Sequence, residues 1–398
     1  MSAILILLDI AAGAVVLTVL LALGQRWRGE LAARRLAKYQ GAVQEHLTAF
    51  VAGARDDPPP PPATAFEQRV MRQDLVAIAP QVKGEARHVL AVAFADYGLI
   101  DLARRDLGAR DGLTRIRAAE ALGSMQIAAA EPWLRERLHN PDPLFQLACA
   151  RALADLGAAE ALPEIVTALA ESGAESGEVA EILLTFGGLA VPFLRARVSD
   201  APPAERRLAV GALGELRALE AAPELRAALE DPDDEVTAGA ARALGQVSDA
   251  QAVPLVLDLL TDAERPWFVH VAAAGALGAL DDPCAAAQLT AALAAEEWDV
   301  RNAASRSLAT LGDAGLQAVA ADLDDLPDVG VAHYAGTLDV EDRWGAVIAR
   351  AAAGDEELAR LVHRAAAAGV TARLEELAAA DDEFASEVME LHPVGAPS

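Results

Sequence analysis

Residues 229–262 read LEDPDDEVTAGAARALGQVSDAQAVPLVLDLLTD, and this stretch holds the pattern that decides the fold. An acidic turn precedes an alanine-rich segment that ends in Ala-Leu-Gly, and a second apolar segment follows. Asp233 is placed to cap the first segment as a helix. Pro254 suits the first turn of the second, where the missing N–H costs no hydrogen bond. The stretch therefore predicts two helices joined by a short turn.

The same two markers recur along the chain. Steps of 29 to 33 residues separate the copies of each marker. The triplets are centred on Leu122, Leu153, Leu184, Leu213, Leu244, Leu277 and Leu308, with a weaker copy at Phe94, and the prolines are Pro132, Pro163, Pro192, Pro223, Pro254 and Pro283. A single helix pair leaves an apolar face uncovered, which stacking of neighbours buries. We expect an all-α, right-handed solenoid of about eight helix pairs. Its core should contain Leu183, Leu184, Leu213, Leu244, Leu277 and Leu308.

The composition excludes several classes of protein. Alanine accounts for 94 of the 398 residues and aromatic residues for 4%, which argues against an all-β fold because alanine favours helices. A net charge of −27 would repel a phosphate backbone, so no nucleic-acid partner is expected. Cys149 and Cys284 form no disulfide framework or metal motif. Both are expected to be small buried apolar residues.

Residues 229–262 resemble a HEAT repeat of the short bacterial type, which also occurs in phycobilisome lyases. The acidic turn, the Ala-Leu-Gly and the Ala-Val-Pro carry the resemblance, together with a Val-Arg pair seen at Val300 and Arg301. Arg115 and Arg206 match the arginine, whereas Gln146, Thr237 and His270 stand in its place elsewhere. The resemblance spans about residues 85–325. It implies a solenoid and leaves function open, because repeat families include scaffolds, adaptors and some enzymes.

The N-terminus is predicted to be a membrane anchor, assigned to residues 1–24. Residues 3–24 are apolar apart from Asp9, and 22 residues are long enough for a bilayer core. Arginines and a lysine follow at positions 26 to 38 and none precedes the span, so the N-terminus is expected outside the cell membrane and the remainder in the cytoplasm. Asp9 either reaches lipid headgroups, or is protonated, or contacts a partner membrane helix near Gly13.

The remaining segments are assigned from composition. Residues 25–53 should form a juxtamembrane helix whose apolar stripe (Leu36, Val43 and Phe50) lies on the membrane, on the solenoid or on another helix. Residues 54–64 hold five consecutive prolines and are expected to be a stiff spacer, or else a recognition ligand. The solenoid is assigned to 65–325. Residues 326–398 should be a helical cap with an acidic, partly frayed tail, or a docking surface for a basic partner.

No catalytic or metal motif is visible in the sequence. The seven histidines have no ligand spacing, and no phosphate loop or nucleophile elbow occurs. We therefore predict no cofactor, no metal and no enzymatic activity. His270 stands where other repeats have arginine, so a structural role is expected for it.

Two groups of residues are candidates for binding a partner. Trp and Phe are scarce in this chain and are enriched at interface hot spots, unless they merely fill gaps between helices; these candidates are Trp133, Trp267, Phe268, Trp298 and Trp344. Arg115, Arg206 and Arg301 recur at one repeat position. They either pair with acids between repeats or form a ladder that faces an acidic ligand.

The sequence thus predicts a membrane-anchored cytoplasmic scaffold or regulator that binds a protein partner. The resemblance adds an integral membrane enzyme as a possible partner. The alternative is a phycobilisome-lyase-like enzyme or chromophore-binding chaperone.

Overall fold

The computed structural model describes residues 37–82, 84–380 and 382–392. Their regular structure is helical, and no strand occurs among them. The chain divides into two compact units, one ending at Ala168 and the other spanning Leu169–Ser398. The all-α solenoid that the sequence predicted is confirmed for this part of the chain.

The first helix among the described residues of the first unit spans residues 37–51. It continues with α2 (Ala65–Ile78), α3 (Glu85–Asp96), α4 (Leu99–Asp106), α5 (Gly112–Ser124), α6 (Glu131–Arg137), α7 (Pro143–Asp155) and the first part of α8 (Leu162–Ser172). The odd-numbered helices from α3 to α17 carry the triplets, α19 packs next to α17, and the even-numbered helices between them return the chain. We call these the first-row and second-row helices.

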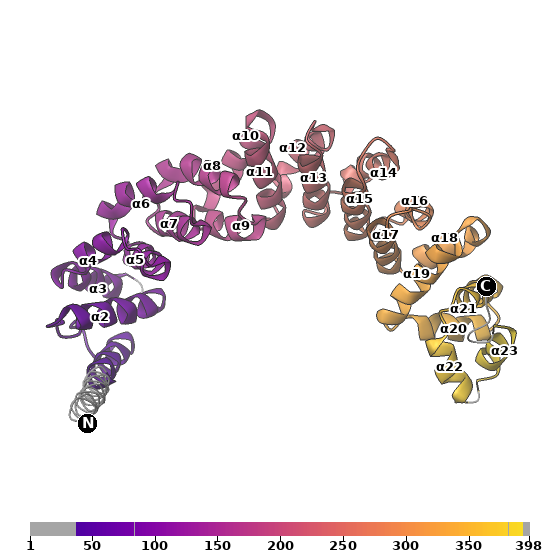
Figure 1. Cartoon of the computed structure of the whole chain (residues 1–398), viewed down its shortest axis with the longest axis horizontal. Helices are drawn as coiled ribbons and strands as arrows, with labels where there is room; N and C mark the ends of the chain where they lie inside the picture. The colour runs from indigo at the N-terminus through magenta and orange to yellow at the C-terminus, as the bar shows by residue number, and fades with distance from the viewer. Residues whose placement is uncertain (1–36, 83, 381, 393–398) are drawn as a thin grey trace, which may run out of the picture. The chain divides into compact units, whose positions relative to one another are not determined.

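The second unit continues the alternation. Its helices are α9 (Ser176–Leu184), α10 (Ala190–Asp200), α11 (Pro203–Glu215), α12 (Ala222–Ala227), α13 (Asp234–Gln246), α14 (Val253–Thr261), α15 (Trp267–Leu280), α16 (Ala286–Ala292), α17 (Trp298–Thr310), α18 (Asp313–Ala321) and α19 (Asp328–Val340). The chain then forms α20 (Trp344–Ala352), α21 (Glu356–Ala367), α22 (Ala372–Ala379) and α23 (Glu383–Leu391). Figure 1 shows α11, α13, α15 and α17 side by side in one row.

The Ala-Leu-Gly triplet marks the contact between successive first-row helices. A Cβ placed on Gly123 would lie 2.6 Å from the Cα of Ala152, the first residue of the next triplet. The same relation joins Gly214 to Ala243, Gly245 to Ala276 and Gly278 to Ser307. Glycine, which has no Cβ, allows the two helix backbones to come this close. The alanine-rich composition therefore follows from close stacking of helices.

Each first-row helix from α3 to α19 ends in the same way. The residue four positions after the central one has positive φ: Gly98, Gln126, Gly157, Gly187, Arg217, Ser248, Asp281, Gly312 and Asp342. In α5 the amide of Ile127 donates to the carbonyl of Leu122 at 3.0 Å, and α11 and α13 repeat this bond. Such a left-handed residue satisfies the last carbonyls of a helix.

The positive-φ series corrects the register of one repeat. Gly187 lies four residues after Leu183, so Leu183 is the central residue of α9. Leu183 is fully buried and Leu184 is 65% exposed. The prediction that Leu184 is a core residue was wrong, because two adjacent leucines left the choice open by one position. The other predicted core leucines are buried.

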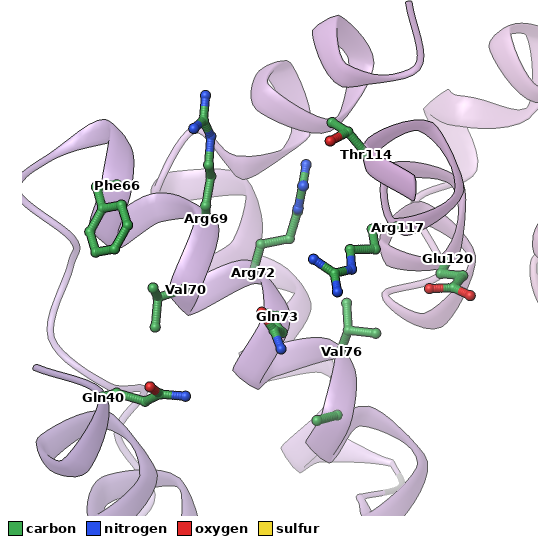
Figure 2. A pocket seen from close by; sticks show the side chains of 11 residues that line it. Gln40, Phe66, Arg69, Val70, Arg72, Gln73, Val76, Thr114, Arg117 and Glu120 are labelled. Carbon is green, nitrogen blue, oxygen red and sulfur yellow. The ribbon is translucent and has the colours of Figure 1, made fainter. Parts of the chain in front are cut away.

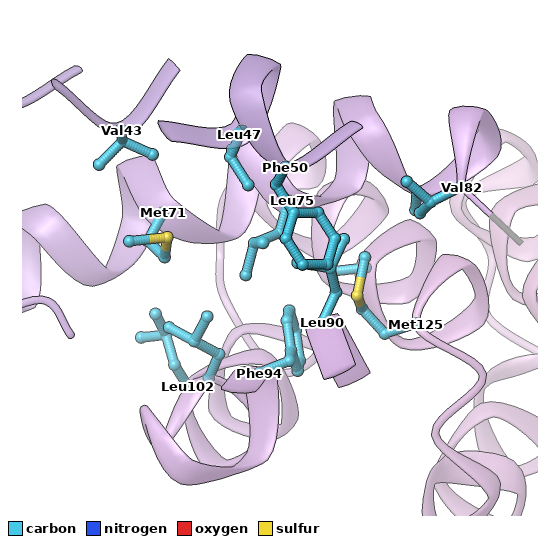
Figure 3. Close-up of a cluster of buried hydrophobic side chains, with 13 residues drawn as sticks. Val43, Leu47, Phe50, Met71, Leu75, Val82, Leu90, Phe94, Leu102 and Met125 are labelled. Carbon is cyan, nitrogen blue, oxygen red and sulfur yellow. The ribbon is translucent and has the colours of Figure 1, made fainter. Parts of the chain in front are cut away.

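The helix over 37–51 packs on the first helices of the unit. Val43, Leu47 and Phe50 are buried with Met71 and Leu75 of α2 (Figure 3). Leu90 and Phe94 of α3 belong to the same cluster. Of the three locations left open for the apolar stripe, the structure shows the solenoid.

The proline segment is held against the same region. Pro59 is buried, and the hydroxyl of Tyr97 donates to its carbonyl at 2.5 Å. The segment links the helix over 37–51 to α2, and these two helices share one hydrophobic cluster. It therefore connects two helices that pack together, and its role as a spacer or as a recognition ligand stays a prediction.

Two further expectations need correction. The acidic tail contains α23, whose Ala385 and Val388 are buried against the preceding helices, so residues 383–391 are ordered as a packed helix.

Cys149 is buried, as expected, and burial raises the pKa of its thiol to about 12. Cys284 is exposed, contrary to expectation, in the 3₁₀ turn Pro283–Ala285.

The predicted anchor at residues 1–24 lies outside the described residues, as do Asp9 and Gly13. Within the part of the chain that the structure describes, no helix combines the length and apolar character needed to cross a bilayer.

Candidate functional site

The recurring arginine position has a structural role that several residue types share. In α5, α7, α11, α13, α15 and α17 its side chain binds a backbone carbonyl in the segment that precedes the helix. Nη1 of Arg206 donates to Ala201 at 2.9 Å and Nη1 of Arg301 to Ala295 at 2.8 Å, while Arg115 reaches Ala109 at 3.3 Å. Carbonyls at helix ends lack intrahelical partners and need such donors.

The repeats that lack arginine fill this position equivalently. Nε2 of Gln146 donates to the carbonyl of Leu138 at 2.5 Å, and the hydroxyl of Thr237 donates to that of Asp231 at 3.2 Å. Nε2 of His270 lies 2.9 Å from the carbonyl of Asp262. The residues that replace arginine thus make the same kind of contact with a backbone carbonyl. The contact of His270 is therefore structural.

Two of the three predicted ladder arginines also pair with acids. Nη2 of Arg115 lies 2.6 Å from Oδ2 of Asp142. Arg206 binds both carboxylate oxygens of Asp231, at 2.8 and 2.7 Å. Arg301 instead binds a second carbonyl, that of Glu296, at 2.7 Å. Their guanidinium groups are thus occupied in joining segments of the solenoid, and a role in binding a ligand stays a prediction.

The aromatic candidates differ in exposure. Trp344 is 1% exposed, which removes it as a surface contact. Trp133 is half-buried, with the guanidinium of Arg104 4.6 Å from its ring centre. Trp267 is 48% exposed and makes an edge contact with Phe268. Trp298 is 57% exposed. Trp344 is the first residue of α20, and its burial was not predicted from the sequence.

Trp298 stands beside two hollows in the first-row face of the second unit. One, of about 510 Å³, lies over α15 and α17, and the other, of about 380 Å³, lies over α17 and α19. Both are lined by Asn302, Arg306 and Glu341. We call this region the Trp298 surface; it also includes Val271, Gly275, Ala279, Asp299, His333, Gly336 and Val340.

The chemistry of the Trp298 surface suits recognition of a peptide. Small or apolar residues form much of its floor, and Val340 is 88% exposed. The side chains of Asn302 and Arg306 offer hydrogen-bond donors, and the Arg306 guanidinium makes no ion pair with another described residue. Ring centres of Trp298 and His333 are 5.5 Å apart.

His333 is partly buried at this surface. Burial, and secondly the charge of Arg301, lowers the pKa of His333. Its ring is tilted by 58° to the indole of Trp298, and the lowered pKa favours the neutral imidazole beside it. The surface therefore combines an aromatic anchor with neutral and cationic donors, the combination found at protein interfaces.

Sequence reasoning found Trp298 but missed its neighbours. A signal was present, since small or polar residues recur every four positions on three helices: Val271, Gly275 and Ala279; Asn302, Arg306 and Thr310; Ala332, Gly336 and Val340. That spacing places each trio on one helix face. The sequence did not show that the three faces adjoin. The described residues contain no group of three His, Cys, Asp or Glu side chains able to hold a metal ion.

Residues 98–182 and 191–272 match the family model of HEAT repeats. This chain contains HEAT repeats. No curated protein matches the chain. Among solved structures, a mutant of Kap121p is similar, with a TM-score of 0.52 and 12% identity over 81% of this chain and 41% of that one. The HEAT-repeat chain thus spans less than half of Kap121p, and the likeness shows the fold alone.

A structure of human deoxyhypusine hydroxylase in complex with glycerol is also similar, with 23% identity over 68% of this chain and 96% of that one. Its TM-score of 0.29 is too low to support an argument about activity. The repeat pattern extends in the structure beyond the matched residues, because α17 makes the triplet contact of Ser307 with Gly278, and α17 and α19 both end in a positive-φ residue.

Proposed function

We propose that this protein is a membrane-anchored HEAT-repeat scaffold or regulator that holds a protein partner in the cytoplasm beside the membrane. The Trp298 surface is the observation that carries the proposal. It places an exposed tryptophan and two hollows on closely stacked helices. Stacked repeats present extended surfaces of this kind to protein partners.

The location rests on the sequence of residues 1–38. The apolar span 3–24 and the arginines that follow it support a single-pass anchor in the cell membrane with its N-terminus outside. An anchor raises the effective concentration of the solenoid near a membrane-embedded partner. An integral membrane enzyme is therefore the partner that we favour. The alternative, a phycobilisome-lyase-like enzyme or chromophore-binding chaperone, predicts bilin binding that our proposal does not.

The partner can be identified by crosslinking in membranes. A photoreactive amino acid at Asn302 should capture one protein reproducibly, and Trp298→Ala should reduce that capture about tenfold, as loss of an interface hot spot does. Leu255→Ala is the matched control, because Leu255 is 40% exposed on α14 in the other row. Equal capture by both variants would show that the Trp298 surface is not the binding site.

The orientation can be tested with the protein's own cysteines. Cys284 is exposed and Cys149 is buried, so a membrane-impermeant maleimide should label Cys284 only after the cells are permeabilised. The carboxylate of Asp282 raises the pKa of Cys284, which makes mildly alkaline buffer preferable. Cys284→Ser supplies the background. Labelling of intact cells would refute the cytoplasmic location.

A further inference from the structure

A groove of about 480 Å³ lies between α2 and α5 in the first unit (Figure 2). One wall is the outer face of α2, where Phe66, Arg69, Val70, Gln73 and Ala77 follow one another at helical spacing. The opposite wall is α5. Its residues Thr114, Arg117 and Glu120 line the groove, and Figure 2 shows Arg117 directed toward α2.

The floor of the groove is apolar and extends along α2. Phe66 is 50% exposed, and Val70, Val76 and Ala77 continue the strip. From residue 66 to residue 77 the strip covers about three helical turns. A long apolar strip between two helices fits the apolar face of a third helix, which presents anchors at positions i, i+3, i+4 and i+7.

The border of the groove carries a net positive charge. Arg69 and Arg117 are exposed, and their guanidinium groups make no ion pair or hydrogen bond with any described residue. Arg72 is neutralised by Asp106 at 2.9 Å. Glu120 is the one carboxylate that lines the groove. In a chain of net charge −27, two uncompensated arginines beside an apolar strip are the local exception.

We propose that the groove between α2 and α5 binds a short amphipathic helix of a partner protein, with acidic residues flanking its apolar face. Apolar side chains of that helix pack on Phe66 and Val70. Its carboxylates pair with Arg69 and Arg117, since an arginine fork matches a carboxylate. The inference goes beyond the proposed scaffold function, because this groove lies in the first unit and does not depend on a membrane.

The test uses the soluble chain beginning at residue 37 in parallel with the full chain in detergent. A displayed library of random 16-residue helical peptides is selected on each, and Kd values of enriched peptides are measured by fluorescence polarisation. Acidic amphipathic peptides should be enriched. Arg69→Glu with Arg117→Glu should weaken their binding about tenfold or more, with steep salt dependence.

Three further variants sharpen the result. Glu120→Lys should tighten binding about threefold by adding a favourable charge, and Phe66→Ala should weaken it without changing the salt dependence. Arg110→Glu is the matched control, because Arg110 is exposed outside the groove and should leave Kd unchanged. Circular dichroism verifies that every variant is folded.

The proposal is overturned if the enriched peptides bind the double arginine variant as tightly as the unchanged protein, or if no acidic amphipathic peptide is enriched. Binding of phosphatidylglycerol vesicles through Arg69 and Arg117, without peptide binding, would assign the groove to lipid and also overturn it. Trp298→Ala should not alter any of these measurements, so failure here is distinct from failure of the proposed scaffold function.

Discussion

Gly278 of α15 faces Ser307 of α17 so closely that a Cβ at this position would lie 2.9 Å from the Ser307 Cα. Three residues earlier on the same helix, a Cβ on Gly275 would meet nothing within 4 Å. Substitution of each glycine by alanine therefore distinguishes the effect of packing on stability from the effect of helix propensity. Alanine gains about 1 kcal/mol over glycine by propensity alone.

We expect Gly278→Ala to lower the Tm, because overpacking costs about 1–3 kcal/mol and outweighs that gain. Gly275→Ala should leave the Tm unchanged or raise it. Thermal unfolding followed by circular dichroism measures both. A rise of Tm in both variants would show that the first-row helices can separate without cost.

Arg206 and Arg207 form a second matched pair of neighbours. Arg206 is 13% exposed and binds both oxygens of Asp231 as well as the carbonyl of Ala201, whereas Arg207 is 46% exposed and 3.9 Å from Asp233. Arg206→Ala should cost about 2–3 kcal/mol, since it leaves a carboxylate and a carbonyl without their partner. Arg207→Ala should change stability by less than about 0.5 kcal/mol. Urea unfolding distinguishes these values, and equal effects would contradict the structural role of the recurring position.

At the scale of single residues, burial could be predicted from the sequence where a residue type repeats with the period of the helices. It could not be predicted where local packing determines exposure. The leucines of the triplets could be predicted because their period matches the stacking. Leu184 and Cys284 could not, since a shift of one position along a helix, or the start of a turn, reverses exposure. Trp344 is the first residue of its helix, as Trp267 and Trp298 are of theirs, yet Trp344 is buried and the other two are exposed.

At the scale of elements, the helix over 37–51 covers an acid on α2. Asp74 is 8% exposed, and its Oδ2 has no hydrogen-bond partner. Burial raises the pKa of Asp74, against the opposing effect of its hydrogen bond with Gln40. The folded chain therefore binds a proton more tightly here than the unfolded chain does, so this group reduces stability as the pH rises from its unfolded to its folded pKa and beyond.

Asp74→Asn should raise the Tm at pH 7.5 by relieving a buried charge, with a gain of about 1 kcal/mol. At pH below the usual range of an aspartate both proteins carry a neutral group, and the difference should vanish. Asp96→Asn, at an exposed site on α3, is the control. A Tm difference that is the same at both pH values would exclude the protonation of Asp74 as its cause.

The location of elements was more predictable than their contacts. Acidic caps and prolines marked the helices, and Asp233 does cap α13 through the amides of Glu235 and Val236. The contacts of the helix over 37–51 stayed ambiguous, because its stripe of Val43 and Phe50 fits a membrane or a protein equally well. The Trp298 surface combines three helices, and the groove lies between α2 and α5, so each depends on contacts between elements from separate parts of the sequence.

At the scale of the whole molecule, the net charge of −27 opposes compaction. Close pairs such as Arg206 with Asp231 are partly buried and are screened weakly, whereas repulsion among exposed carboxylates is screened strongly. The Tm should therefore rise between 10 and 150 mM NaCl. KCl at matched ionic strength should give the same shift. A fall in Tm would mean that exposed ion pairs outweigh the repulsion.

The architecture as a whole was readable from the period of its markers, and the HEAT-repeat match agrees with that reading. The division into two units at Ala168 was not predicted, because leucine and proline markers occur on both sides of it. The spacing of the leucines indicates how neighbouring helices stack and does not locate a boundary between units.

The positive-φ residues that end the first-row helices also define interchangeable segments. Removal of residues 218–248 would join Arg217 to Asp249, and Gly214 would then meet Ala276 as Gly245 does now. An in-frame deletion or duplication of one such interval preserves every helix end and every small-residue contact. Genes for chains built in this way can change length in steps of about thirty codons without passing through an unfolded ancestor.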